Sequence, residues 1–173
     1  DKEKLEKECP EGSIDFDMQI DHVKVNVNSI IIATGWQPYD ATKLDNLGYG
    51  RFPNVITNVV MERYASLSGP TEGKILRPSD NEEVKNVAFV QCAGSRDENH
   101  LPYCSAVCCM GSLKQARYVR EKYPEANVTV FYIDIRVIGW LEKFYYDMLD
   151  DEKVRFVKGK VASIEEDAAT KNL

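Results

Sequence analysis

Four of the five cysteines in this chain lie close together, and thiolates are preferred ligands of soft metal centres. They are Cys92, Cys104, Cys108 and Cys109, with the spacing C-x11-C-x3-C-C. An iron–sulfur cube needs four such ligands, and three close ligands with one farther away meet that need. The adjacent pair Cys108-Cys109 is unlike structural zinc sites, which favour C-x2-4-C knuckles. The spacing therefore predicts a [4Fe-4S] site.

Other roles compete for the same cysteines. A hydrophobic core would accommodate one or two free thiols, but these four surround the polar run Ser-Arg-Asp-Glu-Asn at residues 95–99. Structural disulfides need an oxidising compartment, and the chain opens Asp-Lys-Glu-Lys without an apolar secretory segment. A redox-active vicinal disulfide at Cys108-Cys109 and a zinc site stay open as alternatives.

The composition is that of a globular protein without nucleic-acid or membrane-spanning features. The 173 residues are 43% hydrophobic, which suffices for the core of one domain or two small ones. A formal net charge of −6 without a basic cluster argues against binding to nucleic acid. No apolar run approaches the ~18–20 residues of a membrane span, so any membrane link would come through a partner.

Alternating strand and helix patterns from residue 84 onward must position the cysteines. Apolar runs predict strands at 84–91, 127–133 and 154–157, with one more at 161–164, and periodic segments predict helices at 105–122 and 140–149. The inner face expected for the first helix consists of Val107, Leu113, Ala116, Tyr118 and Val119. This α/β order with short links predicts a parallel sheet with flanking helices, the first half of a doubly wound fold.

The part before residue 84 is less regular. Residues 1–13 are charged and helix-like, and strand-like stretches follow at 14–18 and 22–27. Ser29–Ala33 is a short apolar run of the kind that is buried in a central sheet. The turn-rich stretch 39–83 contains one predicted short helix near residues 58–64.

The turn after the first strand of this second unit does not suit a dinucleotide. Such a turn needs several glycines, so that the backbone can approach the pyrophosphate, and only Gly94 is present. Asp134 ends the next strand, where an acidic residue often binds a ribose, and Arg136 is nearby. However, Asp134 lies 42 residues after Cys92, against the usual ~20 after the glycine turn. We predict that this unit does not bind NAD and that Asp134 is a strand-end or capping residue.

The remaining polar and aromatic residues favour ordinary structural roles. His22 and His100 are isolated, and His100 is expected to be a solvated loop residue rather than a ligand. The aromatic residues of 140–146 are expected to pack a helix, with any exposed part open to a partner protein. Two scattered histidines give no Ser/His/Asp or Cys/His arrangement, so no catalytic residue is predicted.

Two blocks of the sequence resemble known flavoproteins over about residues 14–165. Ile31-Ile32-Ala33-Thr34-Gly35-Trp36-Gln37-Pro38 resembles the A-T-G-x-x-P segment of thioredoxin-reductase-like, two-dinucleotide-domain reductases. Val90-Gln91-Cys92-Ala93-Gly94-Ser95-Arg96-Asp97, with Tyr103–Ser105 and Val107–Met110, resembles the A-type iron–sulfur flavoproteins of heterodisulfide reductase and their relatives. Among these the flavoprotein subunits of the quinone-interacting membrane-bound oxidoreductase of sulfate reducers look nearest.

This resemblance implies cofactors, partners and a division of the chain. It implies a [4Fe-4S] cluster on Cys92, Cys104, Cys108 and Cys109, and FAD contacts from Thr34 and Gly35 in the full-length parent. Electrons would pass between FAD and the cluster in a heterodisulfide-reductase-like or quinone-interacting oxidoreductase complex. In the methanogen branch of the family they would go toward a heterodisulfide, and in the sulfate-reducer branch they would be exchanged between a membrane quinone-linked subunit and adenylylsulfate reductase. The protein would then be cytoplasmic, peripheral to the inner face of the membrane through its partners. Residues 1–40 would end an FAD-domain segment, 41–83 would connect, and 84–173 would form a truncated nucleotide-type domain.

The sequence also departs from the family pattern. No G-x-G-x-x-G opens the chain, and the second FAD segment does not return before Leu173, so an internal fragment that is inactive alone is expected. Cys9-Pro10-Glu11-Gly12-Ser13-Ile14 resembles the last-ligand tail of a ferredoxin module without its preceding cysteines. Cys9 is therefore expected to be unpaired, or to be a ligand completed by further sequence.

Overall fold

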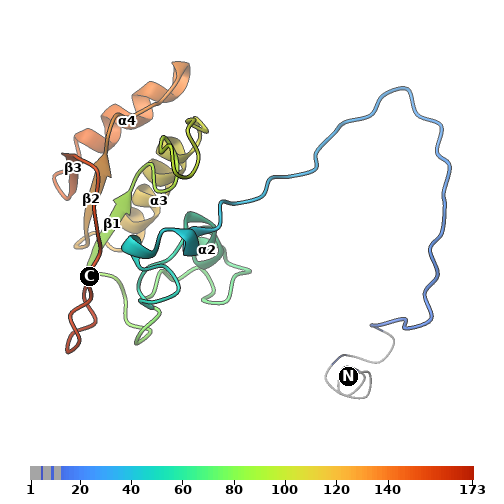
Figure 1. Cartoon of the computed structure of the whole chain (residues 1–173), viewed down its shortest axis with the longest axis horizontal. Coiled ribbons are helices and arrows are strands. Elements are labelled where there is room, and N and C mark those ends of the chain that lie inside the picture. Colours follow the sequence, from blue (N-terminus) through green and yellow to red (C-terminus); the bar gives the residue numbers. More distant parts are fainter. Residues whose placement is uncertain (1–4, 6–8, 10–12) are drawn as a thin grey trace. The chain divides into compact units, whose positions relative to one another are not determined.

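The computed structural model describes Leu5, Cys9 and residues 13–173. The chain divides into two units, Asp1–Trp36 and Gln37–Leu173, and every helix and strand assigned within residues 13–173 belongs to the second unit (Figure 1). Within these described residues no helix is long and apolar enough to cross a membrane. The predicted division at residues 40 and 83 concerns the parent fold and stays a prediction.

Residues 13–36 run as an extended backbone to which no strand or helix is assigned (Figure 1). The strands predicted at 14–18, 22–27 and 29–33 are therefore wrong for this structure. Ile30, Ile31 and Ile32 are 81%, 89% and 83% exposed instead of buried. Residues with high β-propensity need a paired neighbour and a face to bury, and without these the propensity alone does not make a strand. The helix predicted over 1–13 lies almost entirely outside the described residues.

The second unit confirms most of the predicted elements. Short 3-10 turns at Ala41–Lys43, Asp45–Leu47 and Gly139–Leu141 accompany the helices α2 (Asn58–Ala65), α3 (Cys108–Lys122) and α4 (Glu142–Leu149) and the strands β1 (Asn86–Val90), β2 (Asn127–Tyr132) and β3 (Val154–Lys158). The strand predicted at 161–164 is wrong. Its Ile164 amide donates to the carbonyl of Asn46, so this segment bonds to the early part of the unit rather than to the sheet.

The three strands form a parallel sheet in the order β1-β2-β3, which confirms the predicted α/β class. Val87, Val128 and Val154 are in register, and Val128 and Val154 are buried. In the neighbouring row Ala88 pairs with Thr129 and Thr129 with Arg155, and both Ala88 and Arg155 are exposed. Because side chains alternate along a strand, one face of the sheet carries the core and the other is far less covered.

Helix α3 supplies the centre of this core. Leu113, Ala116 and Val119 recur every three residues on one face of the helix, and all three are completely buried. They pack with the inward side chains of β2, such as Val128. Val107 was also expected on this face but is 68% exposed, because it precedes the first helical residue and does not follow the helical direction.

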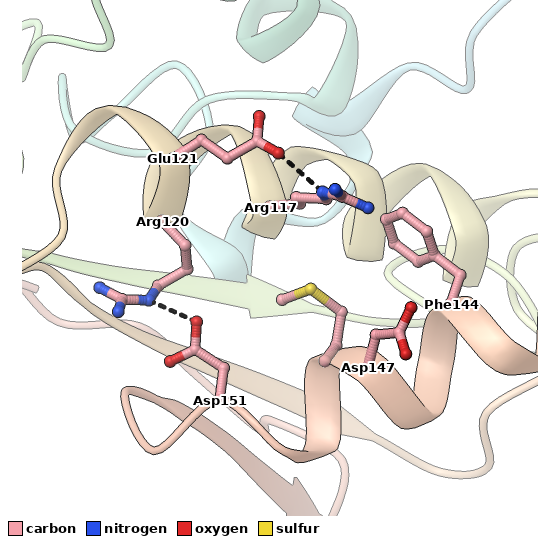
Figure 2. A pocket seen from close by; sticks show the side chains of 7 residues that line it. Arg117, Arg120, Glu121, Phe144, Asp147 and Asp151 are labelled. Carbon is pink, nitrogen blue, oxygen red and sulfur yellow. Dashed lines mark hydrogen bonds and ion pairs between the residues drawn. The ribbon is translucent and has the colours of Figure 1, made fainter.

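A groove between α3 and α4 contains charged side chains that pair with one another. Figure 2 shows Arg117 beside Glu121 and Phe144, and Arg120 facing Asp151. Arg117 Nε donates to Glu121 over 2.7 Å, and Arg120 Nε donates to Asp151 over 2.8 Å. Arg120 Nη1 also donates to three backbone carbonyls, those of Tyr123, Pro124 and Ala126. These contacts satisfy backbone carbonyls after the end of α3 and attach the helix to the turn before β3. The groove is therefore a structural contact between α3 and that turn, which we call a joint.

Helix α2 is attached to α3 by a buried amide. Gln115 is 1% exposed, and its Nε2 donates to the carbonyl of Asn58 and to the carboxylate of Glu62, both over 2.9 Å. Lys114 pairs with the same carboxylate over 2.9 Å. The α2 helix begins after Thr57, whose hydroxyl accepts from the third helical amide. The turn-rich part of the unit is thereby fixed to the helix that carries two of the cysteines.

Candidate metal centre

The fold places all four clustered cysteines where β1 leads into α3. Cys92 comes two residues after β1 ends, Cys104 lies in the following loop, and Cys108 and Cys109 are the first two residues of α3. The loop after β2 reaches the same region, because the carboxyl ends of neighbouring parallel strands lie at one edge of a sheet. The predicted placement of the cysteines in a strand-to-helix connection is confirmed.

The cysteine loop has an unusual backbone. Cys92, Arg96 and Ala106 have φ angles of 56°, 56° and 59°, in the left-handed region that non-glycine residues rarely occupy. Each such residue costs about 1 kcal/mol or more, and such costs concentrate at functional sites. Backbone hydrogen bonds hold the turn, since the Leu101 amide donates to Gly94 and the Arg96 amide to Tyr103.

His100 is fixed within this loop. Its Nδ1 lies 2.7 Å from the hydroxyl of Tyr39, and the two rings meet edge to face. Nearby, Lys160 Nζ donates to Asp97 over 2.7 Å. His100 is half-buried and packed, rather than solvated as expected. The segments around Tyr39 and Lys160 thus hold the outer side of the loop.

All five cysteines are free thiols, and the clustered four influence one another. Cys92 and Cys109 are buried, whereas Cys104 and Cys108 are half-buried. Burial raises the pKa of Cys92, the Arg96 guanidinium lowers it, and the thiols of Cys109 and Cys104 raise it. The Cys108 thiol donates to Cys109, which raises the pKa of Cys108 and lowers the pKa of Cys109 to about 6.

One backbone N–H donates to a clustered sulfur atom, and a second N–H group and a helix N-terminus lie in the same region. The Ala106 amide donates to the Cys104 sulfur over 3.4 Å. Gln91, 5% exposed, lines a small cavity together with Cys92, and its buried Nε2 has no hydrogen-bond partner among residues 13–173. Cys108 and Cys109 occupy the positive N-terminal end of the 15-residue helix α3, which favours negative charge.

The chemistry of this donor set fits a [4Fe-4S] cluster. Such a cluster takes four thiolates, and its reduction potential depends on hydrogen bonds to sulfur and on burial. The region supplies four free thiols, together with amide donors and an orphaned buried N–H group beside Cys92. In the described part of the chain, no three His, Cys, Asp or Glu side chains stand close enough together to hold a metal ion. The thiols thus share a region without forming a closed coordination sphere.

The sequence identified Asp134 and Arg136 at this strand end but did not predict the ion pairs that Asp134 forms. Asp134 lies just past the end of β2, as expected for a strand-end residue, but its carboxylate pairs with Arg96 and Arg136. The strand order could have predicted these pairs. Charged residues that come just after two neighbouring parallel strands lie at the same edge of the sheet, where they can pair. The predicted FAD residues Thr34 and Gly35 belong to the first unit, where both are exposed and Gly35 has a φ of 74°.

Comparison with known proteins supports the resemblance read from the cysteine block. No protein-family model matches the chain. It is 45% identical over 163 residues to an A-type iron-sulfur subunit of CoB–CoM heterodisulfide reductase from Methanopyrus kandleri, a match that covers 93% of this chain and 25% of that protein. It is 43% identical over 158 residues to the A-type subunit of the H2:CoB-CoM heterodisulfide,ferredoxin reductase of Methanothermobacter marburgensis, covering 90% of this chain and 24% of the relative.

A third relative gives the same result. The A-type iron-sulfur subunit of CoB–CoM heterodisulfide reductase from Methanocaldococcus jannaschii is 41% identical over 170 residues, which are 97% of this chain and 26% of that protein. The chain thus spans about a quarter of the length of the curated relatives that it matches. Over the segment that it spans, this chain is homologous to the A-type iron-sulfur subunits of heterodisulfide reductase.

Proposed function

We propose that Cys92, Cys104, Cys108 and Cys109 bind a [4Fe-4S] cluster, through which this segment takes part in electron transfer. The observation that carries the proposal is the gathering of four free thiols at one sheet edge. Support comes from 45% identity to a protein whose name includes "iron-sulfur subunit". The whole protein would then be an electron-transfer subunit of a heterodisulfide-reductase-like complex.

The chain's own residues would bind the cluster and control its surroundings. When bound, the cluster supplies one-electron redox chemistry, which can be coupled to the two-electron chemistry of a flavin. The thiolates of Cys92 and Cys109 are shielded from water by the loop and by α3, and the Ala106 amide donates to Cys104. In the parent protein Thr34 and Gly35 would contribute to the FAD site, as the resemblance of their segment implies.

The partners are proposed at the level of the family. The names of the relatives place them in reductases of the CoB–CoM heterodisulfide, some with ferredoxin. Adenylylsulfate reductase and the quinone-linked membrane subunit are proposed from the resemblance to the sulfate-reducer branch, as is a location at the inner face of the membrane. The methanogen branch and the sulfate-reducer branch of the family differ in the acceptor that reoxidises the reduced whole protein. The acceptor is a heterodisulfide in the first and an adenylylsulfate-linked enzyme in the second. Measuring reoxidation by each acceptor separates them.

Metal and sulfide content tests the cluster. The 173-residue chain would be made and reconstituted without oxygen, and iron, sulfide and zinc would be counted per chain for wild type, Cys108→Ser and Cys9→Ser. We expect about four irons and four sulfides in wild type and in the Cys9 control, and their loss in Cys108→Ser. One zinc, or no metal with an oxidised Cys108-Cys109 pair, would contradict the proposal.

The adjacency of two free thiols, Cys108 and Cys109, favours a second function, which is thiol–disulfide chemistry. The hydrogen bond from Cys108 to Cys109 lowers the pKa of Cys109 to about 6, and a thiolate is the reactive form of cysteine. A pyridine-nucleotide disulfide oxidoreductase would bind NAD(P)H and cycle these thiols reversibly without iron. Dithiol titration of the iron-free chain with and without NADPH tests this. A zinc-stabilised or metal-free docking module is the third outcome, distinguished by the zinc count.

A further inference from the structure

Asp134 joins two arginines that come from different loops of the cysteine region. Arg96 Nη1 pairs with Asp134 Oδ1, and Arg136 Nε donates to Asp134 Oδ2 over 3.4 Å. Arg96 belongs to the loop after β1, whereas Asp134 and Arg136 follow β2. The carboxylate therefore uses a different oxygen for each guanidinium and holds two positive groups side by side.

Asp134 also accepts a hydrogen bond from the Cys109 thiol through its backbone carbonyl, and the two guanidinium groups act electrostatically on other thiols of the site. The Arg96 guanidinium interacts with the thiol of Cys92, and that of Arg136 with the thiol of Cys104. The Cys109 thiol donates to the backbone carbonyl of Asp134 over 3.9 Å, and the Arg136 backbone N–H lowers the pKa of Cys109. Arg96, Asp134 and Arg136 therefore act on three of the four clustered cysteines, namely Cys92, Cys104 and Cys109.

A purely structural role explains the arrangement poorly. The Asp134 side chain is 47% exposed and that of Arg136 is 45% exposed, and ion pairs so exposed contribute only about 0–1 kcal/mol to stability. With a cluster bound, the four thiolate ligands outweigh the positive charge of its iron–sulfide core, and the net negative charge favours nearby cations. Positive charge beside a redox centre favours its reduced form, because reduction adds one negative charge.

We propose that Arg96 and Arg136 supply positive charge and N–H donors to the cysteine site, that Asp134 orients them, and that together they raise the reduction potential of the cluster bound there. The three are positioning residues, and the inference rests on the proposed function. In the step concerned the cluster gains one electron from an added reductant, and no bond forms or breaks. An anaerobic dithionite titration supplies that electron and yields the midpoint potential.

The test compares charge-removing and charge-keeping variants of the reconstituted 173-residue chain. For Arg96→Gln and Arg136→Gln we expect the equilibrium constant for one-electron reduction to fall about tenfold, equivalent to 59 mV. Arg96→Lys and Arg136→Lys should stay near wild type, because they keep the charge. Arg117→Gln is the matched control, since Arg117 lies on α3 but pairs with Glu121 in the groove between α3 and α4. Its potential should not change.

Asp134→Asn separates orientation from charge. Losing a negative charge alone would raise the potential, whereas losing the orientation of both arginines would lower it. We expect the reduction potential of Asp134→Asn to fall below that of wild type. A rise would overturn the positioning role of Asp134.

The remaining outcomes also decide the inference. Unchanged potentials in both glutamine variants with full iron content would overturn it and leave the proposed function standing. If a glutamine variant loses its cluster while the matching lysine variant keeps it, the result supports a role for the positive charge. Loss of the cluster in both variants would overturn that role. A wild-type chain that binds no iron removes the proposed function and this inference together.

Discussion

Gly94 shows how one position in the cysteine loop depends on the absence of a side chain. Its φ of 78° lies in the left-handed region, and a Cβ added there would lie 2.9 Å from the ring of Tyr39. Tyr39 in turn contacts His100, so displacing its ring would disturb the outer side of the loop. Steric exclusion and backbone conformation therefore act at the same residue.

Gly94→Ala should destabilise the chain by about 1–3 kcal/mol, because both the backbone and the Tyr39 ring would have to adjust. Gly111→Ala is the matched control. Gly111 lies inside α3 and has open space around its Cβ position, so alanine there should stabilise by about 0.5–1 kcal/mol. Urea unfolding of both variants measures these changes. Equal stability of Gly94→Ala and wild type would show that the loop adapts without cost.

At the scale of elements, the joint between α2 and α3 depends on Gln115. Its Nε2 satisfies two acceptors on α2, whereas its Oε1 is buried without a hydrogen-bond partner among the described residues. Gln115→Ala removes both hydrogen bonds and leaves a cavity, so a loss of about 2–4 kcal/mol is expected. Gln115→Met should cost less, since it fills the space and removes the orphaned oxygen.

Lys114→Ala serves as the comparison for this joint, because the pair between Lys114 and Glu62 is exposed and should contribute at most about 1 kcal/mol. Thermal and urea unfolding of the three variants give the ranking. A methionine variant as unstable as the alanine variant would mean that the hydrogen bonds, and not the filled volume, hold α2 in place.

The joint at the other end of α3 should depend on pH. The hydrogen bond from Arg120 is the largest effect that lowers the pKa of Asp151. A carboxyl whose pKa is lower in the folded state adds stability above its unfolded value of about 3.9, and this stability is lost as the pH falls toward the folded value. Asp151→Asn should therefore flatten the loss of unfolding free energy below about pH 4.

Asp147→Asn is the control for that pH dependence. Asp147 pairs with Lys143 on the same helix, and the Lys143 side chain is 81% exposed, so the contribution of this pair is small. Urea unfolding of wild type and both variants between pH 3 and 6 measures the difference. If Asp151→Asn follows the wild-type curve throughout, the Arg120 contact does not stabilise the folded state.

Elements with a regular period could be predicted, and contacts between distant loops could not. The spacing of Leu113, Ala116 and Val119 fixes one helical face, and short apolar runs bounded by turns mark β1 to β3. The grouping of the four cysteines between the end of β1 and the start of α3 was visible in their spacing. Their arginine neighbours were not, because Asp134 meets Arg96 only once the sheet brings two strand ends together.

On the scale of the whole molecule, the two units differ in how far their apolar residues are buried. The second unit buries a continuous core that includes Leu113 and Val130, whereas Ile30–Ile32 and Val23 of the first unit are largely exposed. Apolar character alone predicted a buried strand at Ser29–Ala33. Burial requires a partner surface as well as an apolar run, and a sequence pattern reports only the run.

This difference predicts the order of proteolysis. Lys24 is the only lysine or arginine within residues 13–36 and is exposed on a backbone to which no helix or strand is assigned. Arg117 and Lys122 also have exposed side chains but lie within α3, so cleavage there requires local unfolding. Trypsin should therefore cut after Lys24 well before it cuts α3, and mass spectrometry of timed samples gives the order.

Lys24→Gln is the matched variant for this measurement. It should remove the early product and leave the rate of cleavage in α3 unchanged, because the core packing of the second unit does not involve Lys24. The early product should also unfold in urea at the same midpoint as the uncut chain and retain all four clustered cysteines. Cleavage within α3 as fast as at Lys24 would mean that the second unit opens as readily as residues 13–36, and its core would then not be the stable part of the chain.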